Sequence, residues 1–237
     1  MTVRQLHTVD HLYDVSGDGF SPKGTLIGDG AELSDSEMSS LQSDQSFRLL
    51  AACLSLCHNS QISKVEGRWS AIGDPTDSAC AVLGWKLNGH IGKFAQRHPR
   101  IHEFFFNTDR KRMSVIHEYE GDRWVFVKGA AGGFVPITSH RFKDGEIVSI
   151  EKSDFENAQK VNDSMGSKSM RVIALAARKL EPDEDVEDIE VVESGLIFLG
   201  LVGIMDPPRP EVRDAIKICQ DAGIKVKMIT GDHHLTA

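Results

Sequence analysis

The stretch DPPRPEVRDAIKICQDAGIKVKMITGDHHLTA, residues 206–237, decides the architecture at the end of this chain. Proline is excluded from a helix interior but accepted in its first turn, so the spacing predicts a helix that begins at Pro210. Gly223 is expected to stop this helix, because glycine readily adopts the left-handed conformation that follows a last turn. The apolar face of the helix recurs at helical spacing, at Val212, Ala215, Ile216 and Cys219.

A short strand is expected directly after that helix, because apolar residues alternate with lysines over residues 224–228. Thr230, Gly231 and Asp232 then place a hydroxyl, a glycine and a carboxylate at the carboxyl end of the strand. Ligands bind at that end of the strands in open α/β sheets. The alternative is a plain tight turn, since three residues alone are weak evidence for a site.

Length and composition describe a protein that can bury its own core. The chain has 237 residues, of which 40% are hydrophobic and 26% charged, enough for one domain or slightly more at roughly 100 to 200 residues per domain. No apolar run approaches the ~20 residues that a membrane span needs. The net charge of -8, with acidic residues concentrated over 181–193, leaves no basic face for nucleic acid. Neither nucleic acid nor direct membrane contact is expected.

The cysteines and histidines favour packing over metal binding. Cys53, Cys57, Cys80 and Cys219 are scattered over segments with helical patterns, and no signal peptide is expected, which fits a reducing compartment. The CxxC spacing of zinc ribbons is absent, and buried cysteines usually behave as small apolar residues. No metal site is expected among them. A Walker A loop and a GxGxxG motif are also absent, so neither a P-loop nor a dinucleotide fold is supported.

Periodic patterns along the rest of the chain predict both helices and strands. Residues 1–15 are expected to be an extended entry, residues 16–45 a loop rich in turns, and the acidic residues 181–193 a solvated loop. Two helices are predicted at 47–57 and 153–165. Strands are predicted at 101–106, 113–119, 124–128, 170–176 and 196–204.

The segment GDPTDSA, residues 73–79, predicts the start of another helix, which continues through Leu87. Asp74 is a good N-cap, Pro75 suits the first helical position, and Asp77 stands where a capping box places an acidic group. Capping explains Asp74 and Asp77 as well as ligand binding does, so both interpretations stay open.

Three further segments place cations beside apolar strands. FFFNTDRKRMSV, residues 104–115, carries the charged cluster 109–112 between two strands, which is either a solvated hairpin tip or a binding loop. Lys128 ends an apolar strand and is followed by Gly129, which permits close approach of the backbone; the alternative is a strand-terminal lysine beside a glycine turn. Arg171 stands as the one cation at the mouth of a buried strand.

Taken together, these segments resemble the P-type ATPases, the ion pumps that pass the terminal phosphate of ATP through an aspartyl-phosphate. The matching segments, in the family's order, are GDPTD at 73–77, F-x-x-x-R-K-x-M-S-V at 106–115, KGA at 128–130, the arginine-led strand at 171, and DPPR with MITGDH at 206–233. The resemblance implies an α+β fold for residues 1–202, a nucleotide-binding domain whose mostly antiparallel sheet is flanked by helices. Residues 203–237 would then be a partial phosphorylation domain of the α/β, haloacid-dehalogenase-like type.

The resemblance also assigns roles to single residues. Phe106 would stack on adenine, and the other nucleotide-binding residues would be Thr76, Asp77, Lys111, Lys128, Gly129 and Arg171. Asp206 and Arg209 would form the hinge, while Thr230, Gly231 and Asp232 would act on the phosphate and magnesium side. The chain departs from the family where Asp77 replaces the more usual Glu, and where Ala131-Gly132 replaces a Pro-Glu pair, a change expected to make that loop more mobile.

The implied function is that of the ATP-binding cytoplasmic domain of an integral membrane pump, most similar to the calcium-like branch, with ATP and Mg2+ as ligands and the remainder of the same pump as partner. The DKTGT segment that carries the phosphorylated aspartate in this family is absent, so the fragment is expected to bind ATP without turnover. Two alternatives are a nucleotide-independent scaffold module and a haloacid-dehalogenase-type phosphatase. The phosphatase would need a DxDGT-like segment, which the sequence lacks.

Overall fold

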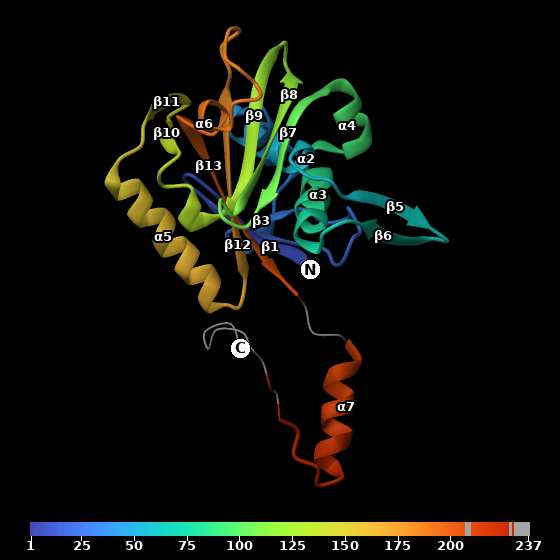
Figure 1. The fold of residues 1–237 in the computed structure, drawn as a ribbon. Helices are drawn as coiled ribbons and strands as arrows, with labels where there is room; N and C mark the ends of the chain where they lie inside the picture. Colours follow the sequence, from blue (N-terminus) through green and yellow to red (C-terminus); the bar gives the residue numbers. More distant parts are fainter. Residues whose placement is uncertain (207–209, 228, 230–237) are drawn as a thin grey trace.

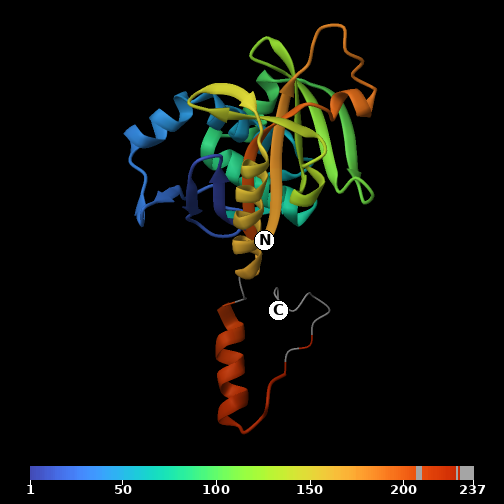
Figure 2. The same ribbon diagram turned by 90° about the vertical axis from the view of Figure 1, so that its left-hand side faces the viewer.

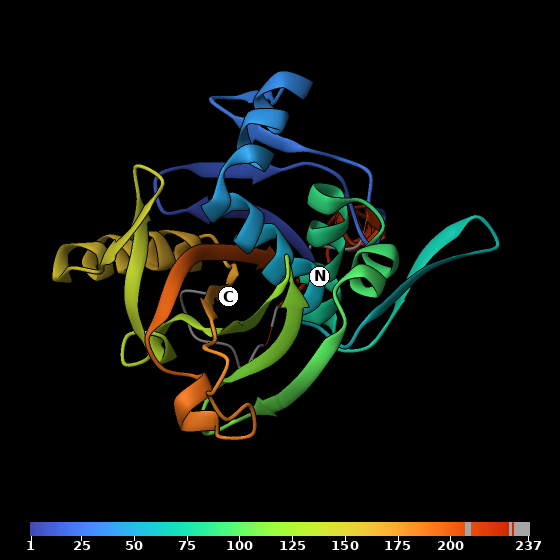
Figure 3. The same ribbon diagram turned by 90° about the horizontal axis from the view of Figure 1, so that it is seen from above.

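The protein is an α+β domain built on one large curved sheet, as seen in a computed structural model that describes residues 1–206, 210–227 and 229 (Figures 1 and 3). The sheet has eleven strands in the order β4-β3-β2-β1-β13-β12-β9-β8-β7, and the β10–β11 hairpin joins it at β13. Of the strand pairs in the described residues, only β10 with β13 is parallel. The expected fold class, a mostly antiparallel sheet flanked by helices, is therefore confirmed.

The strand bounds follow the alternation of apolar residues in most places. The strands of the large sheet are β1 (Thr2–Thr8), β2 (Leu12–Val15), β3 (Leu26–Gly28), β4 (Ala31–Glu32), β7 (Arg100–Asn107), β8 (Arg112–Tyr119), β9 (Asp122–Ala130), β10 (Thr138–Lys143), β11 (Glu146–Ser149), β12 (Arg171–Lys179) and β13 (Leu196–Met205). A separate hairpin consists of β5 (Gln61–Val65) and β6 (Arg68–Ile72).

Helices lie on both faces of the sheet, and the last helix of the described residues lies apart from it (Figure 1). They are α1 (Asp35–Ser43), α2 (Gln45–Leu56), α3 (Pro75–Asn88), α4 (Ile91–Arg97), α5 (Lys152–Ser167), α6 (Ile189–Val192) and α7 (Pro210–Asp221), with a 3-10 turn η1 at Ala131–Gly133. No helix in the described residues is both long enough and apolar enough to span a membrane.

Alternating residues of the central strands divide the core into two layers. Leu175 and Ala177 of β12 pack with α2 and α3, while Ala174 and Ala176 pack in a second cluster that includes Met165 of α5. Because successive side chains of a strand point to opposite faces, α2 and α5 lie on opposite sides of the sheet. β13 is buried on both faces, which explains its continuous apolar run LIFLGLVGIM. It continues through Met205, so the sheet includes residues 203–205.

Two segments expected to be loops contain helices. Residues 35–43 form α1, which begins at a capping box in which the Ser34 hydroxyl accepts from the Glu37 amide and the Glu37 carboxylate accepts from the Ser34 amide. The acidic residues 181–193 contain α6, whose N-cap is Asp188. Helix α1 is polar and has no buried residue, and α6 has only four residues, so neither shows the apolar repeat that reveals a helix in sequence.

The segment after the sheet follows the sequence only in part. Helix α7 has the predicted bounds and lies apart from the body of the domain (Figures 1 and 2), and Gly223 after it has a positive φ of 75°. The expected strand is not formed over residues 224–227. A strand requires a neighbour that pairs with its backbone, and the described part of the chain places none beside these residues.

Candidate functional site

A cavity of about 660 Å³ opens between the start of α3, the β7–β8 hairpin and the strands β9 and β12. Five segments that are far apart in the sequence contribute to it, and its walls combine aromatic, aliphatic and charged side chains. Its lining residues are Asn59, Asp74, Thr76, Asp77, Phe105, Phe106, Lys111, Met113, Lys128, Gly129, Ala130, Arg171, Val172 and Ile173.

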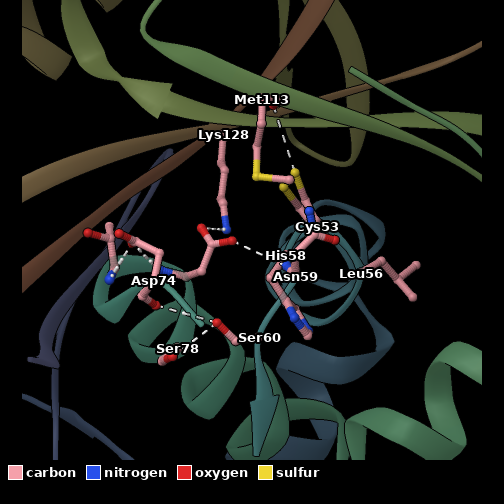
Figure 4. A network of polar contacts seen from close by, with 12 residues as sticks. Cys53, Leu56, His58, Asn59, Ser60, Asp74, Ser78, Met113 and Lys128 are labelled. Atoms are coloured by element: carbon pink, nitrogen blue, oxygen red, sulfur yellow. Dashed lines mark hydrogen bonds and ion pairs between the residues drawn. The ribbon is translucent and has the colours of Figure 1, made fainter. Parts of the chain in front are cut away.

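Lys128 is the buried cation of this cavity. Its side chain, 5% exposed, extends from the sheet toward the start of α3 (Figure 4), where its Nζ lies 2.6 Å from Oδ1 of Asp77. The other oxygen of Asp77 accepts the backbone amide of Asn59 at 3.2 Å. Burial lowers the pKa of Lys128, but nearby groups raise it and the net direction is upward, so the ammonium stays charged. Those groups are the Cys80 and Cys57 side chains in their ionised forms and the carboxylate of Asp77.

Helix α3 begins as the GDPTDSA segment predicts. The Oδ1 of Asp74 accepts the backbone amides of Thr76 at 2.8 Å and Asp77 at 3.2 Å, and Pro75 occupies the first turn. The capping box, however, is not formed, because the Asp77 carboxylate is paired with Lys128. Asp74 therefore caps the helix, while the carboxylate of Asp77 pairs with Lys128 in the cavity wall.

The tip of the β7–β8 hairpin supplies the aromatic wall and a second cation. Phe105 and Phe106 are 69% and 59% exposed, although both are large apolar residues. Lys111 has a positive φ of 53°, a conformation uncommon for a residue with a side chain. Its amide donates to the carbonyl of Asn107 at 2.7 Å, and its own carbonyl accepts the amide of Ala130 at 2.9 Å. These bonds fix the backbone of Lys111 where its side chain lines the cavity.

Gly129 is required by the close approach of β8 and β9 beside that tip. A Cβ at this position would lie 2.4 Å from the carbonyl oxygen of Lys111 and 2.5 Å from the Cβ of Arg112. Either distance is too short for a side chain, so glycine is the residue that allows the two strands to meet at the cavity.

Arg171 closes the cavity from the side of β12. It is exposed, and its Nη1 donates to the hydroxyl of Thr76 at 3.0 Å, which links β12 to the first turn of α3. Met113, Val172 and Ile173 line the cavity as apolar residues between the charged ones. The site thus combines exposed aromatic rings and aliphatic side chains with three cations, and Asp74 and Asp77 are the acidic residues that line it.

Comparison with known proteins assigns the chain to a family. The family profile described as P-type ATPase, cytoplasmic domain N, matches residues 46–211. The chain belongs to the P-type ATPase family. The cation-transporting ATPase pma1 of Synechocystis sp. is 36% identical over 241 residues, which is all of this chain and 26% of the relative. The calcium-transporting ATPase of Bacillus subtilis is 37% identical over 239 residues, again all of this chain and 26% of the relative.

A relative with a different named cargo is also similar. The sodium/potassium exporting P-type ATPase cta3 of Schizosaccharomyces pombe is 34% identical over 210 residues, which cover 87% of this chain and 20% of the relative. The chain spans about a quarter of the length of the first two relatives. Residues 46–211 correspond to cytoplasmic domain N of the family.

The structure brings together one group of the residues singled out in this P-type ATPase sequence. Seven of them line the cavity described above: Thr76, Asp77, Phe106, Lys111, Lys128, Gly129 and Arg171. Asp206 lies instead beyond the end of β13, where its carboxylate is 3.2 Å from the amino group of Met1. The remaining residues, Arg209, Thr230, Gly231 and Asp232, lie outside the described residues.

Sequence reasoning missed several residues of the cavity wall. Asn59 and Phe105 line the cavity without having been singled out, whereas Asp74 was considered both as a helix cap and as a ligand contact. Phe105 could have been found from its position next to Phe106. Asn59 reaches the site through its backbone amide, which donates to Asp77, and the sequence carries no signal for that contact. The described residues contain no group of three or more His, Cys, Asp or Glu side chains arranged to hold a metal ion.

The histidine and cysteines behind the cavity pack as neutral groups. Burial, together with the charge of Lys128, lowers the pKa of His58 to about 4. Burial raises the pKa of Cys80 to about 11, so its thiol stays protonated at neutral pH. Cys53 and Cys57 are also buried, and their sulfurs face the backbone carbonyls of Val127 and Met113. These residues support the floor of the cavity as core.

Proposed function

We propose that this domain binds ATP, as its magnesium complex, in the cavity between α3 and the sheet. The observation that carries the proposal is the convergence of two exposed aromatic rings and three cations on one cavity from separate parts of the chain. A volume of about 660 Å³ also fits the range of small-molecule pockets, about 300 to 1,000 Å³.

Each part of the cavity suits one part of a nucleotide. Phe105 and Phe106 offer ring faces for a base, and stacking on an aromatic side chain contributes about 1–3 kcal/mol per base. Lys111 and Arg171, which are exposed, can reach phosphate oxygens without leaving a buried partner. Lys128 is already paired with Asp77, so it would act from the wall of the cavity as a fixed charge.

The magnesium ion would arrive with the nucleotide. Mg2+ in nucleotide sites is held largely by substrate phosphates and water, with one or two carboxylates. The cavity carries Asp74 and Asp77, whose oxygens cap α3 and pair with Lys128. Because these oxygens are already engaged, the residues fit a site in which Mg2+ enters bound to the phosphates of the nucleotide. They do not fit a site that binds Mg2+ before the nucleotide.

We further propose that in the whole protein the domain presents the terminal phosphate to an aspartate on another part of the chain. Catalysis would then rest on positioning and charge stabilisation. Thr230, Gly231 and Asp232 would act at the phosphate, and Asp206 and Arg209 at the hinge. The relatives named for calcium transport favour a calcium-like pump with this domain on the cytoplasmic side. The isolated chain is expected to bind ATP without hydrolysing it.

Titration of the isolated chain with ATP and Mg2+ tests the proposal, by calorimetry or by backbone amide shifts. Saturable binding is expected, with shifts in residues 105–113 and 128–130. The changes Phe106→Ala and Lys111→Ala should each weaken binding roughly tenfold. Lys64→Ala, on the exposed β5–β6 hairpin, is the matched control and should change nothing. If none of the chains binds, the domain is a scaffold module. If the three variants and the unaltered chain bind equally, this cavity is not the nucleotide site.

A further inference from the structure

Glu193 is a buried carboxylate outside the cavity wall. It lies in the acidic segment 181–193, which the sequence predicts to be a solvated loop. Its side chain is 3% exposed and accepts three charged or polar donors. Arg110 forms an ion pair with it, the Nε of Arg112 lies 2.6 Å away, and the hydroxyl of Ser114 donates at 2.7 Å. Each donor comes from the tip of the β7–β8 hairpin or from the start of β8.

The acidic segment that carries Glu193 is itself fixed to the sheet. Arg178 of β12 donates to both oxygens of Glu184, at 2.8 and 3.0 Å, and to the carbonyl of Val191 at 2.7 Å. Glu193 is the C-cap of α6, and its amide donates to the carbonyl of Ile189 at the start of that helix. The carboxylate of Glu193 is therefore held in place from the sheet side.

Arg110 and Arg112 link the fixed carboxylate of Glu193 to the cavity wall. Arg110 also donates to the carbonyl of Phe105 at 2.9 Å, and Arg112 donates to the carbonyl of Gly133 at 3.3 Å. Lys111 stands between them in the chain and lines the cavity, as do Phe105 and its neighbour Phe106. The contacts of Glu193 thus reach the backbone of the loop that presents the aromatic wall and the exposed cation.

We propose that Glu193 is a positioning residue for nucleotide binding, which couples the acidic segment 181–193 to the shape of the cavity. Without the carboxylate, two guanidinium groups would lie side by side without a counter-charge, and the Ser114 hydroxyl would lose its acceptor. The loop 105–112 would then relax, and the rings and Lys111 would leave the positions that a nucleotide needs. The inference rests on the proposed ATP site.

Three variants test this inference. Glu193→Gln removes the charge with little change of shape, and Glu193→Asp restores the charge on a shorter stem. Glu187→Gln is a matched control, because Glu187 is an exposed residue of the same segment. We expect Glu193→Gln to weaken MgATP binding roughly tenfold, Glu193→Asp to recover part of that loss, and Glu187→Gln to leave the affinity unchanged. Equal losses in Glu193→Gln and Glu187→Gln, or none in Glu193→Gln, would overturn the proposal.

A double-mutant comparison separates positioning from general destabilisation. If Glu193 acts through Lys111, the Glu193→Gln change should cost clearly less affinity in a Lys111→Ala chain than in the unaltered one. The same fold-loss in both backgrounds would contradict the proposal. Should Glu193→Gln fail to fold, Arg110→Gln replaces it, since Arg110 is 23% exposed and its removal leaves the pair of Arg112 with Glu193 in place.

Amide hydrogen exchange makes the result independent of ATP. In Glu193→Gln, exchange should rise within residues 105–112 and at the Ala130 amide, while the amides of α2 stay protected. If exchange rises in this way but no chain binds ATP, the proposed nucleotide site is wrong, while the structural role of Glu193 stands. If exchange over residues 105–112 is unchanged in Glu193→Gln, Glu193 does not position this loop.

Discussion

The ion pair between Lys128 and Asp77 joins the sheet to the first turn of α3 inside the cavity wall. Both side chains are largely buried, at 5% and 17% exposure, so most of the solvation of each charge is replaced by the pair. The sequence indicated each residue separately but not their contact, because the two positions are remote in the chain. A shared cavity is a property of the folded sheet and not of either segment.

Removal of one member of this pair should destabilise the fold. Asp77→Ala leaves a buried ammonium without a counter-charge, and we expect a loss of about 3 kcal/mol in the free energy of unfolding. Urea denaturation at neutral pH measures it. Asp122→Ala is the control, because its pair with Lys179 is half exposed and should be worth less than about 1 kcal/mol. Adding Lys128→Met to Asp77→Ala should recover most of the loss; no recovery would show that the pair is not the cause.

Gly129 offers a second test at the level of one residue. Gly129→Ala would place a Cβ 2.4 Å from the Lys111 carbonyl oxygen, so β8 and β9 must separate. We expect about 1–3 kcal/mol of destabilisation together with weaker ATP binding, measured by denaturation and titration. A Cβ at Gly132, three positions later, would meet no atom within 4 Å. Gly132→Ala should therefore be tolerated, and similar losses in both variants would refute the packing argument.

At the scale of elements, the sequence predicted those whose apolar residues repeat and missed those without such a repeat. Helices α2, α3 and α5, together with the strands β7, β8, β9, β12 and β13, were expected from periodicity or cap residues. Helix α6 was hidden in an acidic segment, and the burial of Glu193 depends on arginines about 80 positions away in the sequence. A single sequence contains no signal for such a contact. The mobility expected after Lys128 stays a prediction, although residues 131–133 form the turn η1.

The cap of α3 allows a test at this scale. Asp74→Ala removes the acceptor of two backbone amides and should cost about 1 kcal/mol of stability. Asp74→Asn keeps an acceptor oxygen and should restore most of it. Urea denaturation followed by circular dichroism measures both, and equal stability of the two variants would contradict the assigned cap.

At the scale of the whole molecule, helices lie on both faces of the sheet, and His117 is buried with the core while His58 is partly buried. Burial lowers the pKa of His58 and of His117 to about 4. Lys128 adds to this shift at His58, and Arg100 opposes protonation of both rings. These histidines are neutral in the folded chain over a range in which an unfolded chain protonates them.

The domain should therefore lose stability in mild acid. Between pH 6.5 and about 4 the unfolded state binds more protons at these positions than the folded state, so the free energy of unfolding falls as the pH falls. The loss should be on the order of 2 kcal/mol for each histidine. Urea denaturation at pH 7 and pH 4.5 measures it. His117→Gln should flatten this dependence, while the exposed His11→Gln should not; an unchanged slope in His117→Gln would contradict the assignment.

The first and last strands of this sheet along the chain, β1 and β13, lie side by side, and this has a practical consequence for the connectivity of the sheet. Thr2 and Met205 are register partners on the adjacent strands β1 and β13. A linker of a few residues could join position 206 to position 1 and close residues 1–206 into a ring without stretching either strand. Reopening that ring at the exposed β5–β6 turn, where Glu66 and Gly67 have positive φ, would yield a circular permutant with every strand pair retained.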